Sequence, residues 1–209
     1  MDKPFAIFDM DGTLVDSMAY WQRLGREFLR SKGVTGDIEE LLERIKPMTM
    51  TESAALFASE CGIPGTPEAI AAEMNAVMDR HYRQDIPMKA GVLAYLENLR
   101  AKGVRMCVAS ATAEELMASC LGRLGAADCF DFLLSCESVG AGKDRPQVYF
   151  EAARRMGAAP EDTAVYEDAL YAARTAKAAG FYLVGVYDES ARAHWAELTA
   201  LADEAIQTF

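Results

Sequence analysis

The chain has 209 residues, of which 51% are apolar or aromatic; this is enough for a sizeable buried core and excludes a disordered or fibrous protein. Its 32 acidic residues outnumber 21 basic ones and give a net charge of −11. Such a surface repels nucleic-acid phosphates and no block of Lys or Arg offsets it, so we expect no nucleic-acid partner.

The chain opens into a short apolar run with no basic or long hydrophobic segment before it, and no later run approaches the length of a membrane span. We therefore expect a cytoplasmic protein without a membrane partner. No heptad pattern is sustained, so a monomer is the default expectation and a homodimer stays open.

The first run, at residues 5–8, predicts a buried strand that ends in Asp9-Met10-Asp11-Gly12-Thr13. Loops at the carboxyl ends of parallel strands face the ligand crevice. Two carboxylates two residues apart in such a loop repel each other unless a divalent cation compensates them. Gly12 allows the close backbone approach that phosphate contact requires. The alternative is an ordinary acidic turn after a strand.

Residues 17–87 show helical spacing and no strand pattern. An apolar stripe beginning at Met18 predicts one helix, and further helices are predicted at residues 38–45, 51–61 and 67–83. An all-helical insertion after the first strand predicts a cap over an active site. Trp21 and Thr49 are candidate substrate contacts from this cap, although an aromatic residue at helical spacing more often packs in a core.

From residue 88 onward, apolar runs alternate with helical segments that end at a glycine. This alternation predicts an α/β fold with a Rossmann-like parallel sheet covered on both faces. We assign residues 1–16 and 88–209 to this core and residues 17–87 to the cap. The predicted strands of the second part lie at residues 104–109, 130–134, 163–166 and 182–186.

Three later features bring polar groups to the ends of strands or to a loop. Ser110 follows a strand, where its hydroxyl can hold a phosphate or cap the next helix. Lys143 lies in a glycine-containing loop, where it can bind phosphate or remain solvated. Glu167 and Asp168 follow another strand, where they can bind metal or cap a helix. With the first aspartates, these groups form the set that phosphoryl transfer requires: a nucleophile, oxygen ligands for a hard cation and donors for phosphate oxygens.

These motifs resemble the haloacid dehalogenase superfamily, in its helical-capped phosphatase and β-phosphoglucomutase-like branch. The likeness runs from residue 5 to about residue 206. The segment from Phe8 to Ser17 is similar to the family's first motif, Ser110 to its second, Lys143 with the downstream proline and tyrosine to its third, and Glu167-Asp168 to its fourth. The four occur in the family's order.

The resemblance implies that Asp9 is the nucleophile of an aspartyl-phosphate and that Asp11 is the general acid and base. Mg²⁺ would be bound by the Asp9 carboxylate, the Asp11 backbone carbonyl and Asp168, with Glu167 in or near its shell. The family's dehalogenases lack the second aspartate of the first motif. Its presence at position 11 therefore disfavours dehalogenation.

The resemblance also implies that Ser110 and Lys143 hold the transferring phosphoryl group and spread its charge. We expect Gly12, Thr13 and Ala111 to complete the substrate contacts of the core. In this chain the third motif reads Gly-Lys-Asp-Arg-Pro where Gly-Lys-Pro is usual.

We therefore expect a magnesium-dependent phosphatase of the haloacid dehalogenase type, acting on a small phosphorylated metabolite such as a sugar phosphate. The first alternative is a β-phosphoglucomutase-like sugar phosphomutase. The loop at residues 46–53 has no arginine to grip a second phosphate, although Lys46 can replace one, so hydrolysis is favoured. The second alternative is a non-catalytic phosphate-binding regulatory protein.

Overall fold

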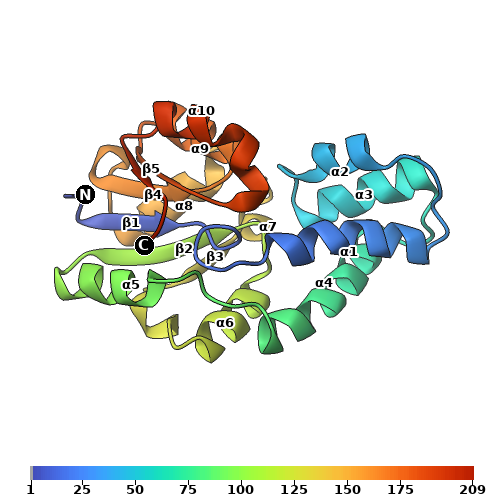
Figure 1. The fold of residues 1–209 in the computed structure, drawn as a ribbon, viewed down its shortest axis with the longest axis horizontal. Coiled ribbons are helices and arrows are strands. Elements are labelled where there is room, and N and C mark those ends of the chain that lie inside the picture. Colours follow the sequence, from blue (N-terminus) through green and yellow to red (C-terminus); the bar gives the residue numbers. More distant parts are fainter. Residues whose placement is uncertain (1) are drawn as a thin grey trace.

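The computed structural model describes residues 2–209, and there the chain forms a six-stranded parallel sheet with helices on both sides (Figure 1). The strand order is β3-β2-β1-β4-β5-β6. This confirms the predicted α/β class. The strands are β1 (Phe5–Phe8), β2 (Arg105–Ser110), β3 (Leu133–Ser135), β4 (Thr163–Glu167), β5 (Tyr182–Val186) and β6 (Glu204–Ile206).

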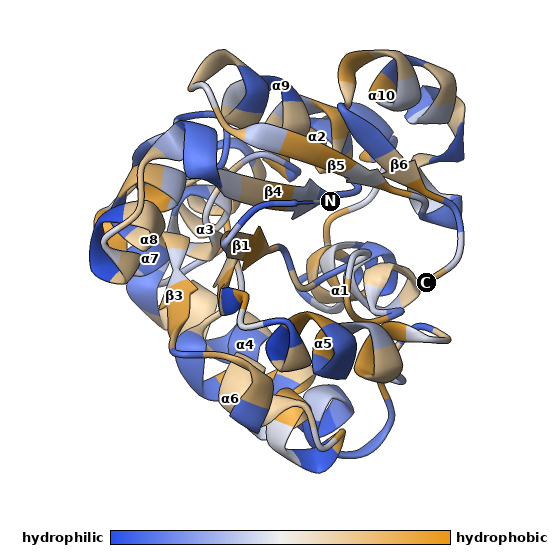
Figure 2. Ribbon diagram, turned by 90° about the vertical axis from the view of Figure 1, so that its left-hand side faces the viewer, coloured by the Kyte–Doolittle hydropathy of each residue, from blue (hydrophilic) through white to orange (hydrophobic). Residues whose placement is uncertain are grey.

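Both faces of the central strands are buried, because successive side chains of a strand point to opposite sides. Phe8 packs in the cluster that includes α5 and α6, whereas Ile7 packs in the cluster that includes α8. Figure 2 shows apolar residues along β1 and β5. The helices of this part are α5 (Val92–Ala101), α6 (Glu114–Arg123), the short α7 (Cys136–Val139), α8 (Gln147–Met156), α9 (Leu170–Ala178) and α10 (Trp195–Leu201).

Four helices between β1 and α5 form a group that lies at one end of the sheet (Figure 1). They are α1 (Met18–Ser31), α2 (Glu39–Ile45), α3 (Met50–Cys61) and α4 (Pro67–Gln84), and we call them the helical segment. Helix α4 starts where a capping hydroxyl and a proline predict a start, because Thr66 accepts the N–H of Ala69. Among residues 2–209, no helix has the length and apolar character needed to cross a membrane.

The two connections between the helical segment and the sheet lie side by side. Val15 and Met88 form an antiparallel bridge, and the N–H of Asp16 donates to the Pro87 carbonyl at 3.0 Å. The helical segment is therefore joined to the sheet at one paired junction. Movement of the segment relative to the sheet would bend both connections together.

The structure differs from the sequence prediction at two strands. The strand predicted at residues 130–134 is observed at Leu133–Ser135, because Asp131 pairs with Arg105 at 2.8 Å and its N–H donates to the Met106 carbonyl before the ladder begins. Strand β6 was not predicted. Its three residues are partly or fully exposed, so the sequence contains no apolar run to mark it.

Candidate active site

The loop after β1 approaches the end of β4. The N–H of Asp9 donates to the Tyr166 carbonyl at 3.0 Å, which extends the pairing of the two strands. Gly12 has a φ of 86°, and a Cβ atom there would lie 2.8 Å from Cγ of Asp168. Both the backbone conformation and the space exclude a side chain. Glycine therefore lets this loop lie directly against Asp168.

Three buried carboxylates meet at the carboxyl ends of β1 and β4. Asp9, Glu167 and Asp168 are 6%, 1% and 3% exposed, and each places one oxygen within 4.8 Å of the others. The parallel pairing of β1 with β4 brings them together, because both strands end at the same edge. Thr13, also predicted here, donates its hydroxyl to Asp168 Oδ1 at 3.2 Å. We call Asp9, Glu167 and Asp168 the acidic cluster.

Lys143 reaches the acidic cluster from the loop before α8. Its ammonium group is buried and bonds both Asp9 Oδ1 and Glu167 Oε1, the second at 2.5 Å. Tyr149, on α8, donates to the same Glu167 oxygen at 2.8 Å. The displaced proline of the third motif thus leaves the lysine at the site. Pro146 stands at the N-cap of α8, one residue before the helix begins.

The acidic cluster carries more negative charge than its lysine offsets. Burial raises the pKa of Asp9 to about 7; Lys143 opposes this shift, while Glu167 adds to it. Burial, and then the charges of Asp9 and Glu167, raise the pKa of Asp168 well above its ordinary value. Burial lowers the pKa of Lys143, but the two neighbouring carboxylates outweigh it and hold this pKa well above the usual range.

The donor set fits a hard divalent cation. Three carboxylates surrounded by protein, with one ammonium among them, leave uncompensated charge that protonation or a cation must neutralise. Carboxylate oxygens are the ligands that Mg²⁺ and Ca²⁺ prefer. The cluster can therefore hold such an ion.

Asp11 lies in different surroundings from Asp9. It is half-buried, and its carboxylate faces neutral donors instead of the lysine. Five side chains donate to its two oxygens: Ser17 (2.5 Å), Tyr82 (2.6 Å) and Trp21 (3.1 Å) to Oδ1, and Thr112 (2.6 Å) and Ser110 (3.4 Å) to Oδ2. We call these five residues the donor shell. It fixes the Asp11 side chain beside the acidic cluster.

Ser110 ends β2 and is buried. Its hydroxyl accepts the N–H of Thr112 at 3.1 Å and lies 3.4 Å from Asp11. Ala111, between the two hydroxyl residues, is half-buried and packs against the α8 side of the sheet. The structure thus brings the second motif next to the first.

The start of α3 and the loop before it contact α7, α9 and the loop that carries Lys143. A Cβ atom at Gly142 would overlap the Pro47 carbonyl oxygen, so the helical segment lies directly over the loop that carries Lys143. Three polar contacts join the two sides: Tyr171 Oη donates to the Lys46 carbonyl at 2.8 Å, the Thr51 N–H donates to Glu137 at 3.1 Å, and Arg145 pairs with Glu52 at 2.8 Å.

The two residues of the helical segment predicted to contact substrate, Trp21 and Thr49, have different surroundings in the structure. Trp21 packs partly against the apolar core, and its indole N–H is shared between Asp11 and Tyr82. Thr49 caps α3: its side chain accepts the N–H of Glu52, and the Glu52 carboxylate accepts the N–H of Thr49 in return. The Thr49 hydroxyl is thus engaged in the cap of a helix.

Three further residues at the site were not among those predicted from the sequence. Thr112 is a hydroxyl two positions after Ser110, which is a recognisable pattern. Tyr171 follows the fourth motif by three residues, one helical turn away. Tyr82 lies far along the chain at the end of α4, and its spacing resembles that of a core residue.

Comparison with known proteins identifies the family of the chain. A family model of haloacid dehalogenase-like hydrolases matches residues 5–180. A phosphorylated carbohydrates phosphatase of Thermotoga maritima is 26% identical over 174 residues, which cover 83% of this chain and 80% of that protein.

Two solved structures have similar folds. One, described as a haloacid dehalogenase-like hydrolase from Bacteroides fragilis, superposes with a TM-score of 0.81 at 26% identity, covering 100% of this chain and 98% of that one. The β-phosphoglucomutase of Clostridium difficile gives a TM-score of 0.80 at 20% identity, covering 99% and 91%. The second likeness concerns the fold alone.

Proposed function

The chain belongs to the haloacid dehalogenase-like hydrolases and is a phosphoric monoester hydrolase, and from this we propose that it cleaves a small sugar phosphate or similar metabolite in a magnesium-dependent reaction through an aspartyl-phosphate on Asp9. The observation that carries the proposal is the buried acidic cluster with Lys143 bonded to Asp9 and Glu167. The phosphatase relative named for phosphorylated carbohydrates supports the substrate class.

In the proposed first step, a carboxylate oxygen of Asp9 attacks phosphorus and the bond to the leaving oxygen breaks. Asp11 gives a proton to that oxygen, so the alcohol departs neutral. In the second step, Asp11 takes a proton from water as the water attacks the phosphoryl group. Inorganic phosphate leaves and the Asp9 carboxylate is restored.

Ser110 and Lys143 would hold the phosphoryl oxygens while charge develops on them. Asp9 and Asp168, with the backbone carbonyl of Asp11, would hold Mg²⁺, and Glu167 stands beside them. When bound, the cation offsets the charge of the carboxylates and of the phosphoryl group. Gly12, Thr13 and Ala111 would complete the pocket in the core.

We propose residues 17–87 as a cap over a core of residues 1–16 and 88–209. The contacts of Lys46, Thr51 and Glu52 with Tyr171, Glu137 and Arg145 support this role, because Arg145 belongs to the same loop as Lys143. A cap in this position would exclude water until the alcohol has left. Trp21 and Thr49 stand on its inner side in this proposal.

Hydrolysis is favoured over a mutase because the loop at residues 46–53 has no arginine to grip a second phosphate. Lys46 is the residue that could replace an arginine in gripping a second phosphate. Its ammonium group is paired with Glu43 at 2.6 Å and both side chains are exposed.

The proposed function predicts magnesium-dependent release of inorganic phosphate from one or more esters in a panel of sugar phosphates, polyol phosphates and p-nitrophenyl phosphate. Release should stop with EDTA and return with added Mg²⁺. Transfer of phosphate to another sugar hydroxyl without release would indicate the mutase. Absence of both reactions in folded, metal-loaded protein would contradict the proposal.

Magnesium should stabilise the protein more at pH 8 than at pH 5. Because the pKa of Asp9 is raised to about 7, protons compete with the metal below that pH and are lost above it. We expect the rise in Tm between EDTA and saturating Mg²⁺ to be larger at pH 8 by roughly 3 °C or more. Matched ionic strength in NaCl is the control. An equal rise at both pH values would argue against metal binding by the acidic cluster.

A further inference from the structure

Asp11 is contacted from both ends of the helical segment. Trp21 lies on α1, just after the first connection, and Tyr82 lies near the end of α4, just before the second. Tyr82 donates to Asp11 Oδ1 at 2.6 Å, and Trp21 donates to the same oxygen at 3.1 Å. The two donors are also bonded to each other at 2.8 Å.

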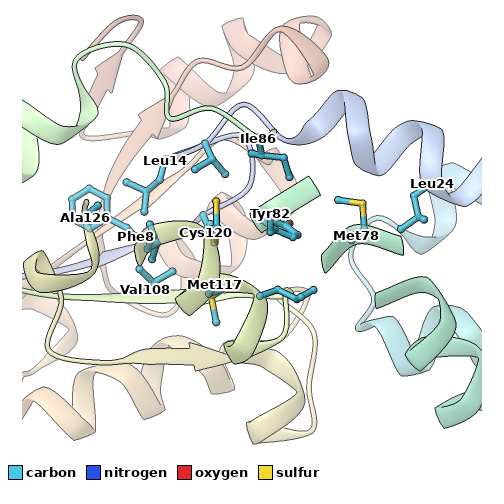
Figure 3. Close-up of a cluster of buried hydrophobic side chains, with 14 of the residues drawn as sticks. Phe8, Leu14, Leu24, Met78, Tyr82, Ile86, Val108, Met117, Cys120 and Ala126 are labelled. Atoms are coloured by element: carbon cyan, nitrogen blue, oxygen red, sulfur yellow. The ribbon is translucent and has the colours of Figure 1, made fainter. Parts of the chain in front are cut away.

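Tyr82 is held by the core as well as by the helical segment. Its side chain is fully buried, and Figure 3 shows it between Met78 on one side and Cys120 on the other. Arg123 of α6 donates to the Tyr82 carbonyl at 3.0 Å and also bonds the Ile86 carbonyl. The phenol is therefore fixed in position where α4 meets the sheet.

We propose that Tyr82 and Trp21 are positioning residues that hold the Asp11 carboxyl group for proton transfer to the leaving oxygen. The inference rests on the proposed role of Asp11 as general acid. Three donors on one carboxylate oxygen select one orientation of the side chain, and two of the three come from the helical segment. Asp11 therefore receives its full set of donors when the ends of α1 and α4 are seated on the core.

The position of a general acid matters because it must lie within hydrogen-bond reach of the atom that it protonates. A displacement of about 1 Å can cost about 100-fold in rate. Ser17, Thr112 and Ser110 would still contact Asp11 in a variant without the phenol, so the loss should be partial. Other residues bind the phosphoryl group in the proposed mechanism, so substrate binding should change little.

Comparing two esters distinguishes a positioning role from a nonspecific loss of activity. An alkyl phosphate needs a proton on its leaving oxygen, whereas p-nitrophenol leaves readily as an anion. For Tyr82→Phe, we expect kcat/KM, which reports the transfer to Asp9 and not the later attack of water, to fall about 10-fold with the best sugar phosphate of the panel and several-fold less with p-nitrophenyl phosphate. KM should change by less than about 3-fold with either ester. Trp21→Phe should give the same pattern with a smaller loss.

Tyr95→Phe is the matched control, since it removes a phenol that contacts Tyr166 at 2.9 Å, away from Asp11. It should show no dependence on the ester. The double variant Trp21→Phe/Tyr82→Phe should lose less than the product of the single losses, because the two residues bind one oxygen and each other. Unchanged Tm values within a few degrees would show that each variant is folded.

The outcomes separate this inference from the proposed function. If Asp11→Asn loses more activity with the sugar phosphate than with p-nitrophenyl phosphate but Tyr82→Phe and Trp21→Phe do not, the positioning role is overturned and the mechanism stands. Equal losses with both esters in the two aromatic variants would overturn it as well. If kcat/KM of Asp11→Asn, which reports the transfer to Asp9 and not the later attack of water, falls equally with both esters, Asp11 is not the general acid; the positioning role then fails with it, while hydrolysis through Asp9 is tested separately by Asp9→Asn.

Discussion

Replacing Asp9 with asparagine is expected to reduce turnover by at least about 10⁴-fold while making the metal-free protein more stable. Asparagine keeps the shape of the side chain but has no anionic oxygen to attack phosphorus. It also removes one charge from the acidic cluster, where Lys143 is the cation bonded to Asp9 and Glu167. Activity and stability should therefore move in opposite directions, which loss of folding cannot produce.

The gain in stability should depend on pH in a defined direction. Burial raises the folded-state pKa of Asp9 to about 7 from its ordinary value of 3.8, so the folded protein binds more protons than the unfolded chain between these values. Stability is therefore lost as pH rises through this window, and the full penalty, up to about 4 kcal/mol, applies above pH 7. An asparagine side chain cannot ionise and avoids this penalty. In EDTA, Asp9→Asn should raise Tm by roughly 5 °C at pH 8 and by less at pH 5.

Asp188→Asn provides a control with the opposite sign. Burial tends to raise the pKa of Asp188, but hydrogen bonds from Lys89 and Ser190 lower it below its ordinary value. The ionised carboxylate, paired with Lys89 at 2.8 Å, thus stabilises the fold above that value, and its loss should lower Tm at pH 8. If Asp9→Asn lowers Tm in EDTA, as Asp188→Asn should, then the acidic cluster does not carry the uncompensated negative charge that we infer. If Asp9→Asn keeps metal-dependent activity, Asp9 is not the nucleophile.

The sequence predicted the acidic cluster because strand ends are visible in it. Short apolar runs mark β1 and β4, and each is followed at once by acidic residues. Parallel pairing then brings Asp9 and Glu167 to one edge whatever the rest of the chain does. Lys143 was predicted from a glycine-containing loop and a resemblance. The structure adds its contacts with both carboxylates.

The donor shell could be predicted only in part. Ser17 and Ser110 lie in or next to motifs, but the helical spacing of Tyr82 is that of a core residue, and its side chain is indeed fully buried. Its hydroxyl meets Asp11 only because α4 returns to the sheet beside the start of α1. That return depends on how the four helices pack against one another, which the spacing of apolar residues in the sequence does not predict. The same limit applied to Trp21, whose apolar surface packs while its N–H reaches Asp11.

Gly12→Ala is expected to weaken magnesium binding by about 100-fold or more, although the substitution adds only one methyl group and replaces none of the proposed ligands. The added Cβ would lie 2.8 Å from Cγ of Asp168 and would overlap its carboxylate. Either Asp168 must turn away or the loop that carries Asp9 must withdraw. Both changes separate the carboxylates that we propose as ligands. The magnesium concentration for half-maximal phosphate release should rise accordingly.

The left-handed backbone at Gly12 also makes an alanine there destabilising, and this effect must be distinguished from the overlap with Asp168. Gly103 has a similar φ of 79°, against 86° at Gly12, but a Cβ atom there would meet nothing within 4 Å. Gly103→Ala therefore carries comparable backbone strain, about 1 kcal/mol, without touching Asp168. In EDTA, Gly12→Ala should lose at least as much stability as Gly103→Ala, because it adds the overlap to the backbone strain, whereas only Gly12→Ala should need more magnesium. If the two show the same magnesium dependence, Asp168 does not bind the metal, since a displaced ligand must weaken its ion.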